Sequence, residues 1–241
     1  MKKLLCSVLV FIGFFTSGVT FAKTQVICYE GRNDCNFILE GLITLETLEK
    51  FESFKKRGKK IGVLMVVSSE GGDIHAAMSI GRLLRKDAAS IYAGRCASAC
   101  VFLVAGAVWR DGIFDDVIII HRPFSTRTYT SYADAKSSIN MLNIEIETYL
   151  KDMNISPALL TAMNSIPSYS ARQLTKTDME TYGLVEKDPV WEEKILGQRA
   201  SQLGIDRPEL HRRIHLMKQQ CDPIPFIKYD EKSACIRAIG M

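Results

Sequence analysis

The chain has 241 residues, 47% of them hydrophobic and 24% charged, and its formal net charge at pH 7 is +4. This length suits one domain, or one domain with an appendage, and this hydrophobic content excludes a largely disordered chain. The charge is too small to indicate nucleic-acid binding, so we expect no nucleic-acid partner.

The start of the chain has the pattern of a secretory signal peptide. Lys2 and Lys3 precede the apolar stretch 4–15, and small and polar residues lead from there to Ala22. The alternative is a membrane anchor, but the stretch is short for a bilayer span and a cleavage-like site follows it. We therefore expect residues 1–22 to be a signal peptide, the mature chain to have no stable membrane span, and its location to be periplasmic or secreted.

The cysteines agree with export. Once Cys6 is removed with the signal peptide, the remaining cysteines fall into local pairs, and an even number in a secreted protein indicates disulfides. Two pairs close short loops near the chain ends, and we expect both to be disulfides. The third is expected with equal weight as a disulfide or as two buried thiols. The first two pairs are Cys28/Cys35 and Cys221/Cys235, and the third is Cys96/Cys100.

The first half of the chain alternates expected strands and helices. A strand and a loop lead to a helix at 45–56, for which Thr44 is the predicted N-cap. The continuous apolar run at 61–67 is typical of a strand buried on both faces. The elements expected next are a helix at 74–85, a strand at 89–93, a turn at 94–98, a helix at 99–107 and a strand at 117–120. This order predicts an α/β fold with a mostly parallel sheet covered by helices.

The second half of the chain is expected to be mainly helical. The amphipathic or charged segments expected to be helical are 132–153, 157–163, 174–186, 191–203 and 208–220. We place one domain at 23–188 and a helical C-terminal extension at 189–241.

Three features fall at the carboxyl ends of successive expected strands, which is where ligands bind in open α/β sheets. Gly71 and Gly72 follow the first strand, and their backbone N–H groups are unobstructed by side chains. Ser98 follows the second strand, at the start of an apolar helix. His121 ends the third. Each has an ordinary interpretation too: a strand-to-helix turn, a helix N-cap and a structural histidine.

Taken together, the three features favour acyl transfer. A serine beside a histidine can act as a nucleophile activated by a general base. The N–H groups of Gly72 and Ala99 could then hold a developing oxyanion. Ser98 and His121 are therefore the catalytic candidates.

Four short motifs also carry a resemblance. They are Ser-Glu-Gly-Gly at 69–72, Gly-Arg-Cys-Ala-Ser-Ala at 94–99, Val-Ile-Ile-Ile-His-Arg-Pro at 117–123 and Tyr-Gly-Leu-Val at 182–185. In order and approximate spacing they resemble the Clp protease proteolytic subunit of the crotonase superfamily. The chain looks closer still to exported members with a Cys-x-Ser-x-Cys motif. The similarity covers about residues 36–187.

This resemblance implies a fold, a site and an assembly. The fold would be the spiral of ββα units of that superfamily. Ser98 would be the nucleophile, His121 the general base, and Gly72 and Ala99 the oxyanion hole. The substrate would be a peptide or protein, with no cofactor and no metal. The protein would form a homo-oligomer through the helix at 132–153.

Two positions depart from the family pattern. Glu70 stands where the family has proline. More seriously, the orienting aspartate of the family falls near Ala171, where Ser170 and its neighbours carry no carboxylate, and the nearest acid along the chain is Asp178. Three options stay open: a dyad in which Ser170 or a backbone carbonyl orients His121, an acid from elsewhere, or an inactive protein.

Other functions receive less support from the sequence. A non-catalytic binding or assembly protein is the main alternative to an exported serine hydrolase, because the aspartate is missing. Chemistry on an acyl-CoA is disfavoured because export separates the chain from coenzyme A. A cysteine nucleophile is disfavoured because exported cysteine pairs tend to be oxidised. His211 and His215 have a spacing that could share a metal, but no third ligand is evident.

Overall fold

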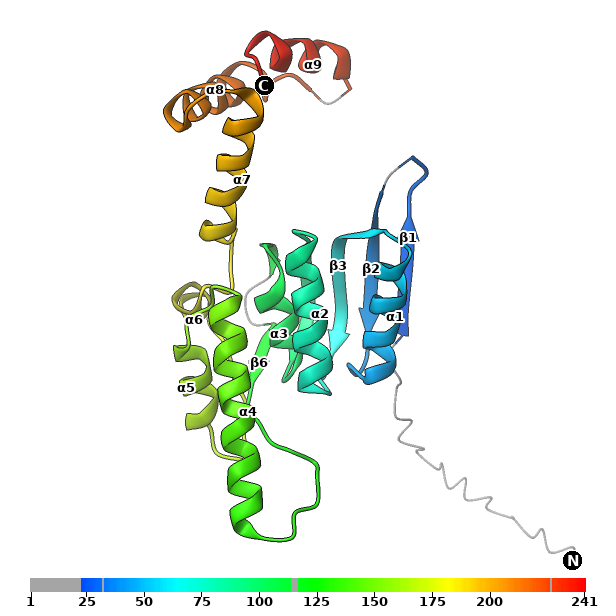
Figure 1. Cartoon of the computed structure of the whole chain (residues 1–241), viewed down its shortest axis with the longest axis vertical. Helices are drawn as coiled ribbons and strands as arrows, with labels where there is room; N and C mark the ends of the chain where they lie inside the picture. Colours follow the sequence, from blue (N-terminus) through cyan, green and yellow to red (C-terminus); the bar gives the residue numbers. More distant parts are fainter. Residues whose placement is uncertain (1–22, 32, 114–116, 226) are drawn as a thin grey trace, which may run out of the picture.

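The computed structural model of the chain describes residues 23–31, 33–113, 117–225 and 227–241 (Figure 1). The expected signal peptide at 1–22 lies outside the described residues. The first part contains β1 (Lys23–Cys28), β2 (Asp34–Glu40), α1 (Leu45–Lys56), β3 (Lys60–Ser69), α2 (Ile74–Lys86), β4 (Ser90–Ala97), α3 (Cys100–Gly106), β5 (Trp109–Ile113) and β6 (Ile118–Ile120). The second part contains α4 (Tyr132–Asp152), α5 (Ala158–Ser165), β7 (Arg172–Gln173), α6 (Lys176–Tyr182), α7 (Pro189–Leu203), α8 (Arg207–Gln220) and α9 (Tyr229–Ala238).

The strands of the described residues form one mixed, mostly parallel sheet. Its order is β1-β2-β3-β4-β6-β7, and β5 also pairs with β4. The central pairs β2/β3, β3/β4 and β4/β6 are parallel, whereas the outer pairs β1/β2 and β6/β7 are antiparallel. The expected α/β class with a mostly parallel sheet is thus confirmed.

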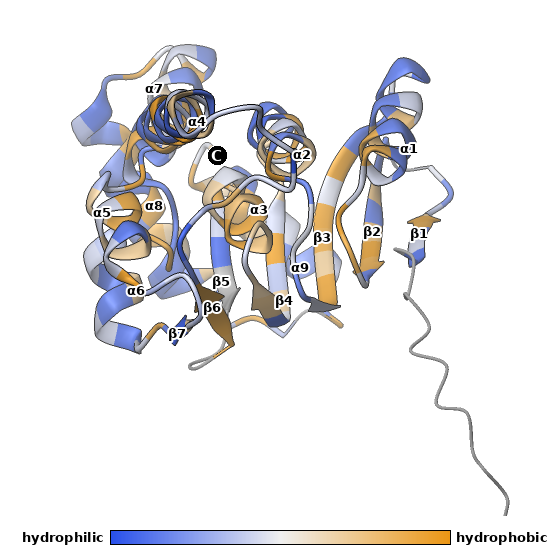
Figure 2. Cartoon of the chain, turned by 90° about the horizontal axis from the view of Figure 1, so that it is seen from below, coloured by the Kyte–Doolittle hydropathy of each residue, from blue (hydrophilic) through white to orange (hydrophobic). Residues whose placement is uncertain are grey.

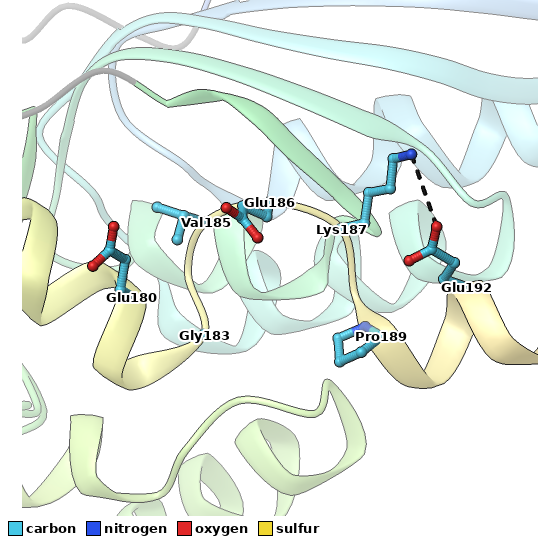
Figure 3. Close-up of a pocket in the computed structure, with 7 residues that line it drawn as sticks. All are labelled: Glu180, Gly183, Val185, Glu186, Lys187, Pro189 and Glu192. Atoms are coloured by element: carbon cyan, nitrogen blue, oxygen red, sulfur yellow. Dashed lines mark ion pairs between the residues drawn. The ribbon is translucent and has the colours of Figure 1, made fainter. Parts of the chain in front are cut away.

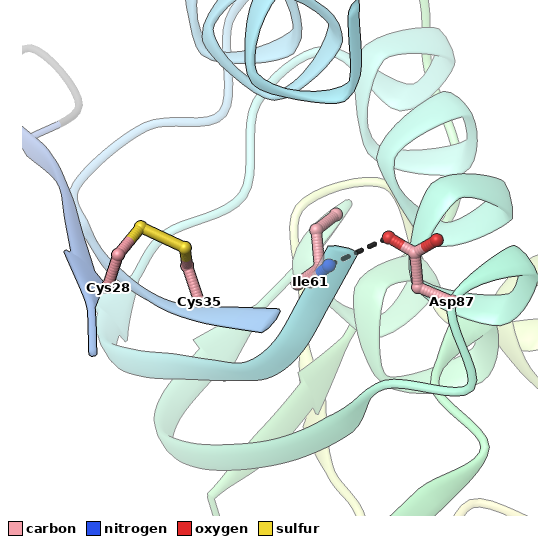
Figure 4. Close-up of a disulfide and its surroundings, with 4 residues drawn as sticks. All are labelled: Cys28, Cys35, Ile61 and Asp87. Carbon is pink, nitrogen blue, oxygen red and sulfur yellow. Dashed lines mark hydrogen bonds between the residues drawn. A yellow bond between two sulfur atoms is a disulfide. The ribbon is translucent and has the colours of Figure 1, made fainter. Parts of the chain in front are cut away.

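A disulfide joins the antiparallel edge strands β1 and β2, and a buried carboxylate binds the start of the neighbouring strand β3. Cys28 and Cys35 face each other across β1 and β2 and are bonded (Figure 4). At the start of β3, the Ile61 N–H donates to a carboxylate oxygen of Asp87 over 2.8 Å, and Lys55 pairs with the same carboxylate. These contacts tie the ends of α1 and α2 to the beginning of the strand between them.

Helices α1, α2 and α3 lie on the same face of the sheet (Figure 1 and Figure 2). The expected helix starts are correct: Thr44 caps α1 in a capping box with Thr47, and the Asp73 side chain caps α2. The opposite face is less covered, because Met65 and Val67 of β3 are 45% and 47% exposed. The expectation that this strand is buried on both faces is therefore wrong.

Helices α2 and α3 cross at two glycines. A Cβ atom on Gly106 would lie 2.3 Å from the Gly81 Cα, so the two backbones touch. Beside this crossing, the buried Tyr149 hydroxyl of α4 donates to the Phe102 carbonyl over 2.6 Å. Burial raises the pKa of Tyr149. This close contact determines the position of α3 relative to α2, and therefore also the position of the residues that precede α3.

Several elements differ from the sequence expectations, among them the two-residue strand β7, which was not expected. β4 continues to Ala97 instead of ending near residue 93, so the turn before α3 is shorter than expected. β5 and α9 were not expected from the sequence. In β5, Arg110 is only 2% exposed and donates to the carbonyls of Val104, Ala105 and Gly183. A buried arginine breaks the apolar pattern by which the other central strands are identified.

Helices α7, α8 and α9 extend beyond the sheet and its helices (Figure 1). Asp188 is fully buried, caps α7 through the Trp191 N–H, and pairs with Arg85 of α2 over 2.7 Å. The Cys221–Cys235 disulfide joins the end of α8 to α9. Within the described ranges, no helix is both long and apolar enough to cross a bilayer.

Candidate active site

Three strand ends bring the predicted site residues to one edge of the sheet. β3 ends at Ser69, β4 at Ala97 and β6 at Ile120. In register, Ser69 lies opposite Cys96, and Cys96 lies opposite Ile118. Since parallel strands point their carboxyl ends the same way, the segments that follow them share this edge.

Ser98 and His121 are hydrogen-bonded across that edge. The distance from the Ser98 Oγ to the His121 Nε2 is 2.6 Å. The Ser98 N–H donates to the Ile119 carbonyl over 2.8 Å, which extends the β4–β6 pairing by one residue. Ser98 also has a φ of 55°, a left-handed conformation that is uncommon for a residue with a side chain and often marks a functional position.

A backbone carbonyl orients the histidine ring. The His121 Nδ1 lies 2.7 Å from the Arg122 carbonyl oxygen. Because a carbonyl only accepts, this contact requires a proton on Nδ1 and leaves the Nε2 lone pair to accept from the Ser98 hydroxyl. The exposed ring of Phe124 lies 5.4 Å from the imidazole, centroid to centroid. Sequence reasoning did not identify Phe124.

Two N–H groups, on the residue after Gly71 and on the residue after Ser98, have no acceptor among the described residues. They belong to the predicted oxyanion residues, the exposed Gly72 and the buried Ala99. Gly71, by contrast, donates its N–H to the Ser69 hydroxyl over 3.2 Å. The glycine turn therefore leaves one of its two amides available at the edge that carries Ser98.

Gly71 has a packing role that sequence reasoning missed. A Cβ atom on Gly71 would lie 2.5 Å from the Ser98 Cβ and 2.8 Å from the Ala99 nitrogen. Gly71 also has a φ of 94°. Any other residue would collide with the serine turn and be strained in its own backbone. The doubled glycine in the sequence is the signal that could have identified this contact.

Cys96 and Cys100 form a disulfide that flanks Ser98. Both residues are fully buried. The alternatives left open by the sequence are therefore decided in favour of the disulfide, and neither sulfur is a free thiol. With the other two bonds, all three expected cysteine pairs are disulfides. They fit an exported protein.

No carboxylate takes the position of an orienting acid at His121 in the described part of the chain. Ser170 is exposed, and no hydrogen bond joins its side chain to the ring. Asp178 belongs to the cap of α6, where it accepts from the Thr175 N–H and pairs with Arg172. The Thr175 N–H and hydroxyl, with Arg172, hold the pKa of Asp178 below its ordinary value.

Glu70, which stands where the family that the motifs resemble has proline, is paired with Arg95. Its carboxylate accepts two hydrogen bonds from Arg95, at 2.7 Å and 3.2 Å. The hydrogen bond from Arg95 lowers the pKa of Glu70. Both side chains are more than half exposed. The pair bridges the ends of β3 and β4 next to the serine turn.

Other candidate sites lie away from this edge. A surface pocket of about 690 Å³ lies where α6 leads into α7 and is lined by Glu180, Gly183, Val185, Glu186, Lys187, Pro189 and Glu192 (Figure 3). None of these residues belongs to the Ser98–His121 pair. His211 lies 3.4 Å from an Arg207 nitrogen. Among the described residues, no three acidic, histidine or cysteine side chains are grouped to hold a metal ion.

Comparisons with known proteins identify no family. No protein-family model matches this sequence, and no curated protein matches it.

Proposed function

We propose that this protein is an exported serine hydrolase, most specifically a peptidase, with the Clp protease type of fold that its motifs resemble. One observation carries the proposal: the 2.6 Å hydrogen bond between the Ser98 Oγ and the His121 Nε2. The left-handed Ser98 and the available N–H groups of Gly72 and Ala99 support the same conclusion.

The chemistry follows from these positions. The Ser98 Oγ attacks the carbonyl carbon of a peptide or ester while its proton passes to the His121 Nε2. The Gly72 and Ala99 N–H groups hold the oxygen that becomes negative. The histidine then protonates the leaving group, and an acyl-Ser98 ester remains. A water molecule hydrolyses this ester by the same steps and restores the serine.

The turnover of such an enzyme should be modest. In a triad, replacing the orienting aspartate by asparagine lowers kcat by about 10⁴, because the imidazole adopts the wrong tautomer. Here the Arg122 carbonyl selects the useful tautomer but does not stabilise the imidazolium as a carboxylate would. We therefore expect a working dyad with a lower rate than a complete triad.

A fluorophosphonate probe tests the proposal on the mature chain, residues 23–241. The wild type should be labelled, and Ser98→Ala should abolish the labelling. The control is Ser201→Ala, which changes an exposed serine of α7. A folded wild type that shows no labelling dependent on Ser98 would overturn the proposal.

A non-catalytic binding protein is the second candidate. The observation in its favour is that His121 Nδ1 meets a carbonyl and not a carboxylate. On this hypothesis, Ser98→Ala leaves the cellular role of the protein intact. Loss of that role in the Ser98→Ala strain, with normal protein levels, would exclude it.

We further propose a periplasmic or secreted location and self-association. The three disulfides support export. Self-association would use α4, on which Met141 and Ile144 lie one helical turn apart and are exposed. Sedimentation velocity should give an oligomer for the wild type, and Ile144→Glu should reduce its mass. A wild type that sediments as a monomer would contradict self-association.

A further inference from the structure

The Cys96–Cys100 disulfide encloses Ser98 in a short covalent ring. Cys96 lies near the end of β4, and Cys100 is the first residue of α3. Their Cα atoms are 5.3 Å apart. An extended chain of this length would separate them by about 13 Å. The strand end, the serine and the start of the helix are thus held in a tight turn by a bond across its base.

Within that turn, the serine holds a conformation that ordinary backbone forces do not favour. A left-handed conformation is strained for a residue with a side chain and persists only where its surroundings fix it. The noncovalent contacts that fix Ser98 are few. Its N–H donates to Ile119, its carbonyl accepts from the Val101 N–H over 3.1 Å, its hydroxyl bonds the His121 Nε2, and Gly71 packs against it.

The size of the ring indicates a local role. Stabilisation of a fold by loop closure grows with the number of residues enclosed. The cysteines of this bond are separated by 4 residues, against 7 for Cys28–Cys35 and 14 for Cys221–Cys235. Of the three bonds it should therefore contribute least to global stability. It is also the only one of them that flanks Ser98.

We propose that Cys96 and Cys100 are positioning residues, whose disulfide holds Ser98 in the left-handed conformation and keeps its Oγ against the His121 Nε2. Without the bond, Ser98 can relax to an ordinary negative φ, which turns its side chain away from the imidazole. This inference rests on the proposed hydrolase function for its kinetic consequence. Its geometric consequence holds whether or not the protein is an enzyme.

The kinetic test compares two matched disulfide deletions. Cys96→Ala/Cys100→Ala should lower the rate of fluorophosphonate labelling by about 10²-fold, the order expected for a displacement of about 1 Å at a reacting group. Cys28→Ala/Cys35→Ala, at the far edge of the sheet, should label at nearly the wild-type rate. Both are assayed well below their melting temperatures. Equal labelling of the folded Cys96/Cys100 variant and the wild type would overturn the inference.

A spectroscopic test does not depend on catalysis. In the wild type, Ser98→Ala removes the hydrogen-bond partner of Nε2 and should shift the His121 ring resonances in an NMR spectrum. In the Cys96→Ala/Cys100→Ala background, the same change should shift them little. An equal shift in both backgrounds would show that the disulfide does not position the Ser98 hydroxyl. If the wild type is not labelled by the fluorophosphonate but the NMR shifts differ as expected, only the hydrolase proposal is rejected.

Reduction of the native protein provides a third measurement if the double variant does not fold. A trialkylphosphine takes up an oxygen atom from water and becomes the phosphine oxide, and two thiols remain at Cys96 and Cys100. Mass spectrometry of alkylated peptides identifies when this pair is reduced. The labelling rate should fall at that point and recover on reoxidation. A rate that stays constant while the pair is reduced would contradict the inference.

Discussion

At the scale of single residues, the candidate site depends on how closely two turns approach each other. Ser98 presents its hydroxyl to His121 from a left-handed conformation, and Gly71 leaves the space that this conformation needs. The Arg122 carbonyl then sets the ring so that Nε2 accepts. Each of these contacts involves backbone as much as side chain. Even a small substitution that changes the backbone conformation of these turns should therefore lower the reactivity of Ser98 strongly.

Replacing Gly71 tests this sensitivity. Gly71→Ala places a Cβ 2.5 Å from the Ser98 Cβ, so we expect fluorophosphonate labelling to fall by about 10²-fold. The control is Gly58→Ala: Gly58 also has a positive φ, but its Cβ would meet nothing within 4 Å. That variant should lose about 1 kcal/mol of stability and keep its labelling rate. Similar labelling of the two variants would refute the packing role of Gly71.

Replacing the histidine tests the dyad. His121→Gln keeps a polar side chain but removes the base, so the labelling rate should fall by about 10²- to 10⁴-fold. His215→Gln, an exposed change on α8, is the control and should leave the rate unchanged. A His121→Gln protein that reacts as fast as the wild type would show that Ser98 does not depend on the imidazole.

At the scale of elements, the crossing of α2 and α3 determines where the serine turn lies. Gly81 and Gly106 let the helix backbones touch, and the Tyr149 hydroxyl fills the remaining space as it reaches the Phe102 carbonyl. Because α3 begins two residues after Ser98, any separation of the helices moves the turn as well. The apolar content of α3 could be predicted from the sequence, but the close approach of its backbone to that of α2 could not.

An alanine at the crossing should be costly. In Gly81→Ala the Cβ would overlap the Tyr149 hydroxyl, and we expect a loss of about 1–3 kcal/mol in the free energy of unfolding. The matched control is Gly197→Ala in α7, where a Cβ meets nothing within 4 Å. There the better helix propensity of alanine should raise stability by about 0.5–1 kcal/mol. Urea unfolding measures both, and a stabilised Gly81→Ala protein would disprove the tight crossing.

At the scale of the whole molecule, a buried charge network joins the sheet, its helices and the C-terminal extension. Asp188 pairs with Arg85 and lies 3.8 Å from Arg110. Burial alone would raise the pKa of Asp188, but the Trp191 N–H and the two arginines hold it below its ordinary value. Burial lowers the pKa of Arg110 to about 10, so this side chain stays charged at neutral pH. The network thus fixes the point from which α7 leaves the body.

The lowered pKa of Asp188 predicts a pH dependence of stability. Its folded-state pKa lies below the unfolded value of about 3.9, so its contribution is present above that value and is lost as the pH falls through the folded pKa. Asp188→Asn should cost about 3–5 kcal/mol near neutral pH, because the buried Arg110 and the partly buried Arg85 lose their partner carboxylate. The difference from the wild type should shrink below about pH 4. Exposed Asp152→Asn should show no such trend. If the difference in the free energy of unfolding between the wild type and Asp188→Asn does not change with pH, the pKa of Asp188 is not lowered by folding.

The chain order of strands and helices could be read from the sequence because apolar periodicity and capping residues act locally. Thr44 and Asp73 begin helices through contacts with the next few residues. β5 was missed because the buried Arg110 is satisfied in part by the Gly183 carbonyl, 73 residues further along the chain. The exposed face of β3 was missed because a strand pattern does not say what covers it. The packing role of Gly71 was missed because its partner, Ser98, lies on another segment. Phe124 was missed because the sequence does not give the conformation of the loop that carries it beside His121.

The sequence by itself determined the alternation of elements, the placement of Ser98 and His121 after successive strands, and the cysteine pairs, because all three depend on residues close together in the chain. Only the tertiary structure decided that Ser98 is left-handed, that a carbonyl orients the imidazole, and that Cys96 and Cys100 are bonded around the serine. These features join residues at most four positions apart, but they depend on the backbone conformation around Ser98 and His121. That conformation is fixed by packing against other segments, such as Gly71 against Ser98, which local sequence patterns do not specify.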